Sequence, residues 1–398
     1  MNDGHSKSVG AARSSGRLAF AGALATAVAF GPARNGYGLF LPYLREEFGL
    51  STELAGLIAS GGYAAYLAAL FAVGMLAARL GPRPLVVAGT MSAALGMMLV
   101  AWSPNAWLLT AGVALAASSA GWSWAPYNDA TERLVPPRLR ARVLSVISTG
   151  TTFGIAGAGI TALIIGESWR LGWVAFSIAA VMALVCNAVV LPGKNSGFRD
   201  ESSEIETGES GLRWILRKSA MPLFIVALSF GVVSSVYYSF AVDHVSRNGD
   251  LTLPLGAPLG SILFVVLGIA GIAGFFTGDA INRLGLRKVL AAILFAAAAA
   301  TILLGVAPGS WAAATVSAVM FGAYVMTISA LLSVWSSLIF PERPSAGFSA
   351  ALGAFAVGSI LAPVSMGFVA GTHGYGMVFM ISGATATLTM LVRPKEKY

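Results

Sequence analysis

The chain has 398 residues, of which 57% are hydrophobic and only 11% are charged, and its mean hydropathy is +0.78. This composition excludes an ordinary soluble globular protein and predicts a polytopic membrane protein, in which the 47 glycines let helices pack closely. The formal net charge of +8 raises the question of a nucleic-acid partner, and the single cysteine, Cys186, excludes a disulfide framework within one chain.

Apolar segments of roughly 20 residues, the length that crosses a bilayer as a helix, recur along the chain. We expect twelve transmembrane helices, at residues 18–43, 53–78, 84–102, 106–128, 143–166, 171–191, 221–243, 256–281, 288–307, 310–338, 346–371 and 374–392. The first segment resembles a secretory signal because Lys7, Arg13 and Arg17 precede it. Its apolar character resumes after Arg34 and continues to Pro42, so it is interpreted as the first helix.

The basic residues are distributed unevenly between the two sides of this arrangement. Of the 25 lysines and arginines, three lie on one side (Arg45, Arg170 and Arg247), Arg34 lies within a span, and the remaining 21 lie on the side of both termini. The positive-inside rule therefore predicts that both termini are cytoplasmic, with a bacterial inner membrane as the expected location. Because topology explains the positive charge, we expect no nucleic-acid partner. The expected partners are the lipid bilayer and a small solute, and the expected state is a monomer.

A polar segment between the sixth and seventh spans divides the chain. Residues 192–220 are rich in Ser, Glu and Gly, and the end of this segment could form a short interfacial helix or remain a solvated linker. The expected parts are a cytoplasmic N-terminal tail at 1–17, a six-helix half at 18–191, a cytoplasmic linker at 192–220, a second six-helix half at 221–392 and a cytoplasmic tail at 393–398.

The two halves repeat each other at a fixed offset of 204 residues. This offset pairs Gly74 with Gly278, Arg79 with Arg283, Gly81 with Gly285, Arg83 with Arg287 and Pro137 with Pro341. Matches at loop positions are harder to attribute to chance than matches between glycine-rich helices. The predicted fold is therefore an all-α membrane protein with twelve helices in two parallel six-helix halves, an arrangement typical of secondary transporters.

Two loops of the repeat carry a recognisable motif. Residues 74–86, GMLAARLGPRPLV, and residues 278–290, GDAINRLGLRKVL, both resemble the G-x-x-x-D-R-x-G-R-R/K signature of the major facilitator superfamily. The resemblance implies a 6+6 transporter fold and a tight cytoplasmic turn that acts in gating. The implied gate residues are Gly74, Arg79, Gly81, Arg83, Asp279, Asn282, Arg283, Gly285 and Arg287. Residues 80–102 are also somewhat similar to monocarboxylate-type members.

This sequence departs from the motif at its acidic position, which is Ala78 in the first copy and Asn282 in the second. A latch between the halves that uses this acid is expected to be weaker here. Asp129 and Glu132 follow the fourth span and could pair with Arg79 or Arg83 to replace part of the latch. Ordinary solvated charges at a helix end are the alternative.

Arg34 is a charged residue inside the first span. An ionisable side chain at membrane depth costs roughly 2.5–3.5 kcal/mol, so it is normally turned toward the protein interior or a wet cavity. In the resembling family the first, fourth, seventh and tenth helices line the central cavity. We therefore expect Arg34, together with its neighbour Asn35, to bind substrate, with the guanidinium holding a carboxylate. A structural ion pair or carbonyl contacts are the alternative.

Further candidate substrate contacts lie on the other three cavity helices. They are Trp124, Tyr127, Asn128, Ser235, Tyr238, Tyr324 and Thr327. The first three share one helix face, and Tyr238 occupies the repeat position of Arg34. An interfacial aromatic belt is the alternative for Trp124, and plain helix packing is the alternative for the tenth span.

Asp243 and His244 end the seventh span on its outer side. They could exchange a coupling proton with the exterior, or they could form a charge pair at the helix end. The charge pair is the simpler interpretation, and proton exchange is the alternative.

The sequence contains no G-x-x-x-x-G-K-[ST] loop, no Ser/His/Asp set at helical depth and no His/Cys cluster. A nucleotide-driven pump, an enzyme, a cofactor and a metal site are therefore not expected. The leading hypothesis is a secondary active transporter of a small organic solute, most simply an anion, coupled to a proton or sodium ion and working by alternating access. The alternatives are a drug or metabolite efflux permease and a non-transporting membrane sensor.

Overall fold

The computed structural model describes residues 2–192, 217–248, 259–342 and 344–394. These residues form helices and no strand. The N-terminal helices are α1 (Asn2–Val28), the π-helical turn η1 (Ala29–Ala33), α2 (Arg34–Phe48), α3 (Thr52–Leu80), α4 (Pro82–Ala101), α5 (Ala106–Ser118), η2 (Ser119–Trp122), α6 (Trp124–Leu134), α7 (Pro137–Ile165) and α8 (Trp169–Val190). The C-terminal helices are α10 (Met221–Arg247), α11 (Leu259–Ala270), η3 (Gly271–Phe276), α12 (Thr277–Leu284), α13 (Leu286–Val306), α14 (Trp311–Ile339) and α15 (Pro344–Thr389).

Ten helices in the described part of the chain are long and apolar enough to cross a membrane. The expected fourth span is divided into α5, a 3-10 turn and α6, and no piece of it reaches the length of a span. The expected last two spans form the 46-residue α15, which Gly374 interrupts with φ 77° and ψ 167°. The all-helical membrane fold is confirmed, whereas the count of twelve stays a prediction. Most of the expected linker, residues 193–216, lies outside the described residues.

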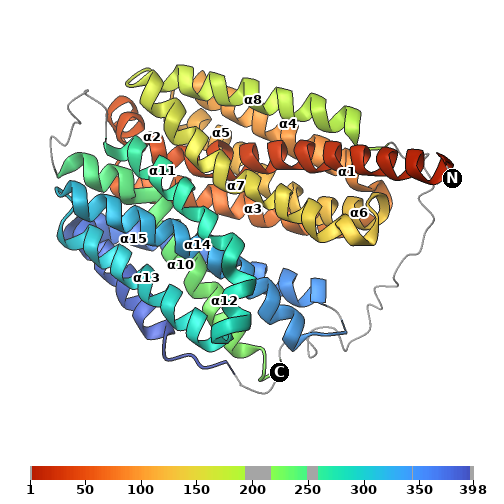
Figure 1. Cartoon of the computed structure of the whole chain (residues 1–398). Helices are drawn as coiled ribbons and strands as arrows, with labels where there is room; N and C mark the ends of the chain where they lie inside the picture. The colour runs from red at the N-terminus through yellow and green to blue at the C-terminus, as the bar shows by residue number, and fades with distance from the viewer. Residues whose placement is uncertain (1, 193–216, 249–258, 343, 395–398) are drawn as a thin grey trace.

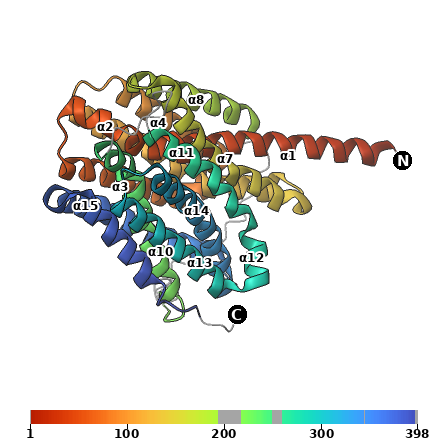
Figure 2. The same ribbon diagram turned by 60° about the vertical axis from the view of Figure 1, so that its left-hand side comes forward.

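The helices form two neighbouring groups (Figures 1 and 2). In Figure 1 the N-terminal helices, in red to yellow, lie above the C-terminal helices, in green to blue. The main contacts between the groups join α3 to α15, α7 to α11 and α2 to α10. Figure 1 shows the groups converging at the end that holds α2 and diverging toward the end at which α1 begins. We call these the joined end and the motif end, because the second carries the turns at residues 79–83 and 283–287.

Small residues allow the close contact between α3 and α15. A Cβ atom added at Gly56 would lie 2.2 Å from the carbonyl oxygen of Pro363, which is too close for any side chain. The Ser60 hydroxyl donates to the carbonyl of Ile360 at 2.6 Å and accepts from the N–H of Val364 at 2.9 Å. In a regular helix the N–H of Val364 would donate directly to the carbonyl of Ile360. Ser60 therefore replaces one backbone hydrogen bond of α15 beside Pro363, which disturbs the helix.

The motif loops form the tight turns that the sequence predicts. Gly81 ends α3 with φ 73°, and Gly285 ends α12 with φ 84°. Both glycines lie in the left-handed region that other residues adopt only with strain, so the glycine of each motif copy is required by the backbone.

Candidate functional site

A cavity lies between the two helix groups, deep in the bundle. Side chains of α2, α3, α5 and α10 line it, among them Arg34, Asn35, Tyr63, Tyr238 and Ser239. Its volume is about 10 Å³, roughly the space that one water molecule occupies. The structure therefore brings together Arg34, Asn35 and Tyr238 from the predicted binding residues, in a state too closed to hold a solute.

Aromatic rings surround the Arg34 guanidinium. Its central carbon lies 4.7 Å from the ring centre of Tyr66, 5.2 Å from those of Tyr63 and Phe355, and 5.7 Å from that of Phe30. Such ring faces attract a cation electrostatically and hold it in place without neutralising its charge. Phe355 belongs to α15, so both helix groups contribute to this aromatic cage, a name we keep for these four rings.

Arg34 has no carboxylate partner among the described residues. None of the three ion pairs found there includes it, and its buried Nε has no hydrogen-bond partner in the same part of the chain. A buried donor that lacks a partner is costly, and in a native structure it calls for an explanation. The guanidinium is therefore a held but unpaired cation at the wall of the cavity.

A π-helical turn directly precedes Arg34. Residues 29–33 form this turn, and it contains Pro32, which has no backbone N–H to give to the helix ladder. The side-chain Nδ2 of Asn35 donates to the carbonyl oxygen of Phe30 at 2.6 Å, across the turn. Because a π-helical turn changes which face of the helix the following residues occupy, it helps to direct Arg34 and Asn35 into the cavity.

Two more polar groups at the cavity are buried and without a partner in the described part of the protein. They are the Oδ1 atom of Asn35 and the hydroxyl of Tyr238. Together with the Arg34 Nε, they give one acceptor, one hydroxyl and one cationic donor at the same cavity, from α2 and α10.

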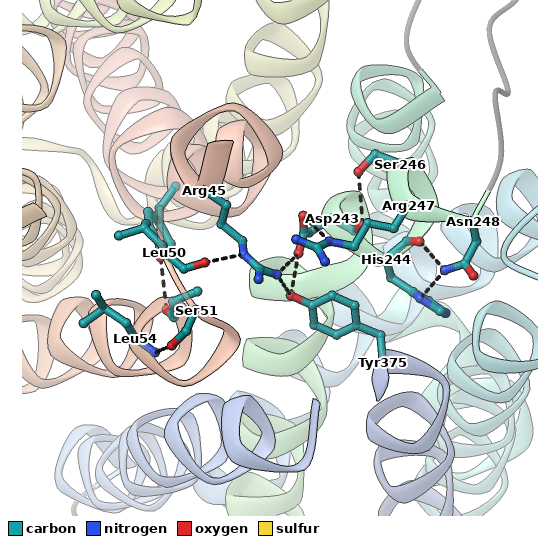
Figure 3. Close-up of polar contacts among 12 residues, drawn as sticks. Arg45, Leu50, Ser51, Leu54, Asp243, His244, Ser246, Arg247, Asn248 and Tyr375 are labelled. Atoms are coloured by element: carbon teal, nitrogen blue, oxygen red, sulfur yellow. Dashed lines mark hydrogen bonds and ion pairs between the residues drawn. The ribbon is translucent and has the colours of Figure 1, made fainter. Parts of the chain in front are cut away.

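A second polar cluster closes the joined end (Figure 3). Arg45 Nη1 lies 2.6 Å from Oδ2 of Asp243 and donates to the Tyr375 hydroxyl at 2.8 Å, while that hydroxyl donates to the same carboxylate oxygen. Arg247 Nε lies 3.2 Å from the other oxygen, Oδ1. Asp243 is 1% exposed. This Asp243 cluster, made of Arg45, Asp243, Arg247 and Tyr375, joins α2 of the N-terminal group to α10 and α15 of the C-terminal group.

His244 takes no part in the contacts of the Asp243 carboxylate. Its Nε2 lies 3.1 Å from the carbonyl oxygen of Leu304, its Nδ1 lies 3.1 Å from Nδ2 of Asn248, and its ring stacks on Phe379. These contacts suit a neutral ring that donates from Nε2 and accepts at Nδ1. Successive residues of a helix point in different directions, so Asp243 pairs with arginines and His244 packs inside the C-terminal group.

Other predicted binding residues lie away from the cavity in this conformation. Tyr127 is fully buried and donates to Oδ1 of Asn187, within the N-terminal helices. Tyr324 is fully buried against Phe230 and Phe321. Of the rest, Ser235 and Thr327 are buried, Trp124 is half-buried and Asn128 is exposed. The cavity-lining set includes none of these six residues, so their contact with a substrate stays a prediction.

The predicted gate residues gather at the motif end. Arg79, Gly74, Asp279, Asn282, Arg283 and Arg287 are exposed, and Arg83 and Asp129 are half-buried. Burial raises the pKa of the Asp129 carboxyl, and the nearby Arg133 acts in the opposite direction. Among the described residues no ion pair joins Asp129 or Glu132 to Arg79 or Arg83. The expected pairing concerns a state closed at this end, so it stays a prediction.

Sequence reasoning missed the Asp243 cluster and the aromatic cage. One signal for the cluster was present: Arg45 is one of only three basic residues on its side of the predicted topology, and Asp243 lies on the same side. The cage left no comparable signal, because tyrosine and phenylalanine occur throughout the spans.

Comparison with known proteins decides the family. The model of the Major Facilitator Superfamily matches residues 19–278. The chain belongs to this superfamily. The ten apolar helices within the described residues and membership of this transporter superfamily identify it as an integral, multi-pass membrane transport protein, as the loop motifs indicated.

Two curated relatives of this superfamily chain are transporters. A gentisate transporter of Corynebacterium glutamicum is 25% identical over 273 residues, which are 60% of this chain and 61% of the relative. The purine ribonucleoside efflux pump NepI of Shigella dysenteriae serotype 1 is 23% identical over 364 residues, which are 89% of this chain and 88% of the relative. The alignment with the gentisate transporter thus spans less than two thirds of that protein.

Solved structures show the same superfamily fold. A POT family transporter in complex with 5-aminolevulinic acid superposes with a TM-score of 0.77 at 13% identity, covering 96% of this chain and 95% of that chain. The xylose transporter XylE from E. coli, in a partially occluded inward open conformation, superposes with a TM-score of 0.75 at 13% identity, covering 95% and 96%. At this identity the likeness establishes the fold alone.

Proposed function

We propose that this protein is a secondary active transporter that moves a small organic anion, most simply a carboxylate, through the cavity between its two helix groups. The observation that carries the proposal is Arg34, a cation at the cavity wall with no carboxylate partner in the described residues. A charged residue at membrane depth is functional by default because its insertion is costly. A substrate carboxylate would supply the missing counter-charge.

The geometry of the site suits a planar, two-oxygen anion. Aromatic rings lie around the guanidinium and orient it, and its Nε has no hydrogen-bond partner among the described residues. The Tyr238 hydroxyl, from the opposite helix group, is the second donor at the same cavity. A substrate held between Arg34 and Tyr238 would contact both groups and would therefore respond to their relative movement.

Alternating access supplies the transport cycle in this proposal. The described state is closed at the joined end, where the Asp243 cluster connects the groups, and the groups diverge toward the motif end. With the topology that the basic residues predict, the joined end faces the exterior and the motif end faces the cytoplasm. Rocking of one group against the other would break the cluster and expose Arg34 to the exterior.

The relatives favour two substrate classes. The gentisate transporter is named for an aromatic carboxylate, which fits Arg34 and the ring-rich cavity. The relative that aligns over the larger share of the chain is named a purine ribonucleoside efflux pump. Export of a neutral, nucleoside-like solute is therefore the second candidate, in which Arg34 would act only through its packing.

Ligand affinity and transport in proteoliposomes separate these candidates. We would measure binding of benzoate, gentisate and adenosine, and uptake under an imposed proton or sodium gradient, for the wild type, Arg34→Lys and Arg34→Ala. Loss of a charged hydrogen-bonded contact of about 1.5–3 kcal/mol should weaken carboxylate binding by roughly 10- to 150-fold in Arg34→Ala. Arg34→Lys should also lose much of the binding, because an ammonium lacks the planar fork of the guanidinium.

The matched control is Arg170→Ala. Arg170 is also an arginine of the N-terminal helices, but it pairs with Glu47 near the protein surface. Removing it should leave the affinity for carboxylates unchanged. Unchanged carboxylate affinity in a stably folded Arg34→Ala protein would contradict the proposal, and adenosine transport that is insensitive to Arg34 would favour the second candidate.

A further inference from the structure

The two ends of the Asn35 amide have different environments. One amide atom lies 2.6 Å from the carbonyl oxygen of Phe30. A carbonyl oxygen only accepts hydrogen bonds, so the atom facing it must be the donating Nδ2 and not the oxygen. The orientation of this amide is therefore determined by chemistry, and its oxygen must occupy the other position.

That oxygen is an acceptor without a donor. Asn35 is 5% exposed, its Oδ1 is buried with no hydrogen-bond partner among the described residues, and the residue lines the cavity beside Arg34. A buried amide oxygen normally finds a donor, because leaving it unpaired forfeits its hydration without replacement. Because Asn35 lines the cavity, we expect a donor to reach this oxygen from there.

Rotation of the side chain would not remove the problem. Turning the amide by 180° would place its oxygen against the carbonyl oxygen of Phe30, so that two acceptors would face each other. The amide NH₂ group would then be left without an acceptor. Moving it away would leave the Phe30 carbonyl without this bond beside Pro32, where the helix ladder already lacks one N–H. The π-helical turn thus holds one defined acceptor at the cavity wall.

We propose that Asn35 Oδ1 accepts a hydrogen bond from a hydroxyl or amino group of the substrate, so that the site selects hydroxy- or amino-carboxylates over carboxylates that lack a donor. This inference rests on the proposed function, in which Arg34 holds the carboxylate. The two side chains are adjacent in sequence and line one cavity, so they read two groups of one small molecule. A site built to bond a substrate hydroxyl discriminates against the analogue without it, because the acceptor is then left unpaired.

Pairs of ligands that differ by one hydroxyl test the proposal on the full-length protein. We would measure the Kd of 3-hydroxybenzoate and benzoate, and of lactate and propionate, for the wild type, Asn35→Leu and Asn35→Ala. In the wild type the hydroxylated member of at least one pair should bind about tenfold more tightly or better. In both Asn35 variants the ratio of the two Kd values should fall to about one.

The ratio of the two Kd values distinguishes a direct contact between Asn35 and the substrate from a purely structural role of Asn35. Loss of the bond to Phe30 would disturb Arg34 and weaken both members of a pair equally, leaving their ratio unchanged. Asn187→Leu is the matched control, since Asn187 is also a buried asparagine of the N-terminal helices but bonds Tyr127 and the Ala21 carbonyl, away from the cavity. This control should leave the ratio at its wild-type value.

Each outcome bears on a different part of the argument. If the wild type shows no preference in either pair, or if the preference survives in both Asn35 variants, the Asn35 inference is overturned. The carboxylate proposal survives in that case provided that Arg34→Ala weakens the binding of benzoate at least about tenfold. If none of the four carboxylates binds the wild type, the proposed function fails and the Asn35 inference fails with it.

Discussion

Asp243→Asn should open the joined end of the bundle. Asp243 accepts from Arg45 of the N-terminal group, from Arg247 of its own helix and from Tyr375 of α15. Only the contact with Arg45 crosses between the two helix groups, because Arg247 and Tyr375 belong to the same group as Asp243. Opening must break this contact and the bond from Arg45 to the Tyr375 hydroxyl, and the substitution should weaken the first of them.

The magnitude follows from the burial of this pair. The Arg45 side chain is 10% exposed and that of Asp243 is 2% exposed, so solvent screens their attraction little. A charged hydrogen bond contributes about 1.5–3 kcal/mol net, which corresponds to roughly a 10- to 150-fold change in the equilibrium between closed and open joined ends. The neutral amide oxygen of asparagine can still accept one hydrogen bond from the Arg45 guanidinium, so the expected change lies toward the lower limit.

Labelling of a cavity cysteine measures this equilibrium. Ala59 lines the cavity and is 5% exposed, and a cysteine placed there in a Cys186→Ser background should react slowly with an impermeant maleimide added at the joined end. Asp243→Asn should raise the labelling rate about tenfold. Arg45→Gln should raise the labelling rate by a similar factor. The labelling rate of the double variant should be close to that of either single variant, because both substitutions remove the ion pair between Arg45 and Asp243.

The control uses the other ion pair near the end of α2. Glu47 pairs with Arg170, but both residues are about 40% exposed (41% and 39%) and both belong to the N-terminal helices. Glu47→Gln should leave the labelling rate unchanged, since no contact between the groups is lost. Equal labelling of the wild type and Asp243→Asn, or fully additive effects of Asp243→Asn and Arg45→Gln, would refute the role of the Asp243 cluster in closing the joined end.

Three further expectations concern packing and topology. Gly56→Ala should disfavour the closed joined end by about 1–3 kcal/mol, because the added methyl group would overpack the contact between α3 and α15. Gly61→Ala should be neutral, because no atom lies within 4 Å of the added Cβ. Melting temperature and the labelling assay check both variants, and equal effects of the two would contradict the close helix contact. Asn187→Leu removes the partner of the Tyr127 hydroxyl and should lower stability by about 1–3 kcal/mol with little change in ligand Kd, which a parallel melting and binding measurement checks; a large loss of affinity would instead move Tyr127 into the binding site. A cysteine at Ser203 should react with an impermeant reagent only after the cytoplasmic side is exposed, and labelling in intact cells would invert the predicted topology.

Local sequence properties determine the class of this protein and the positions of its special residues. Apolar segments of membrane-spanning length and the two loop motifs predict a helical transporter of the major facilitator superfamily, and the family match confirms this. Gly81 and Gly285 were predictable because a tight turn requires a positive φ wherever it lies in the fold. Arg34 was predictable as a cavity residue because a charge in an apolar span has few tolerable positions.

The partners of these residues depend on the tertiary structure. Arg45 and Asp243 are 198 positions apart in the chain, and Arg45 and Tyr375 are 330 apart, so no spacing rule joins them. The direction of a helix face was equally hidden: in this conformation Tyr127, a predicted substrate contact, bonds Asn187 within the N-terminal helices. In a soluble helix the apolar stripe marks the buried face, but a membrane helix is apolar toward lipid and toward its neighbours alike. Hydropathy therefore shows which segments cross the membrane, whereas packing alone decides which side chains face the cavity.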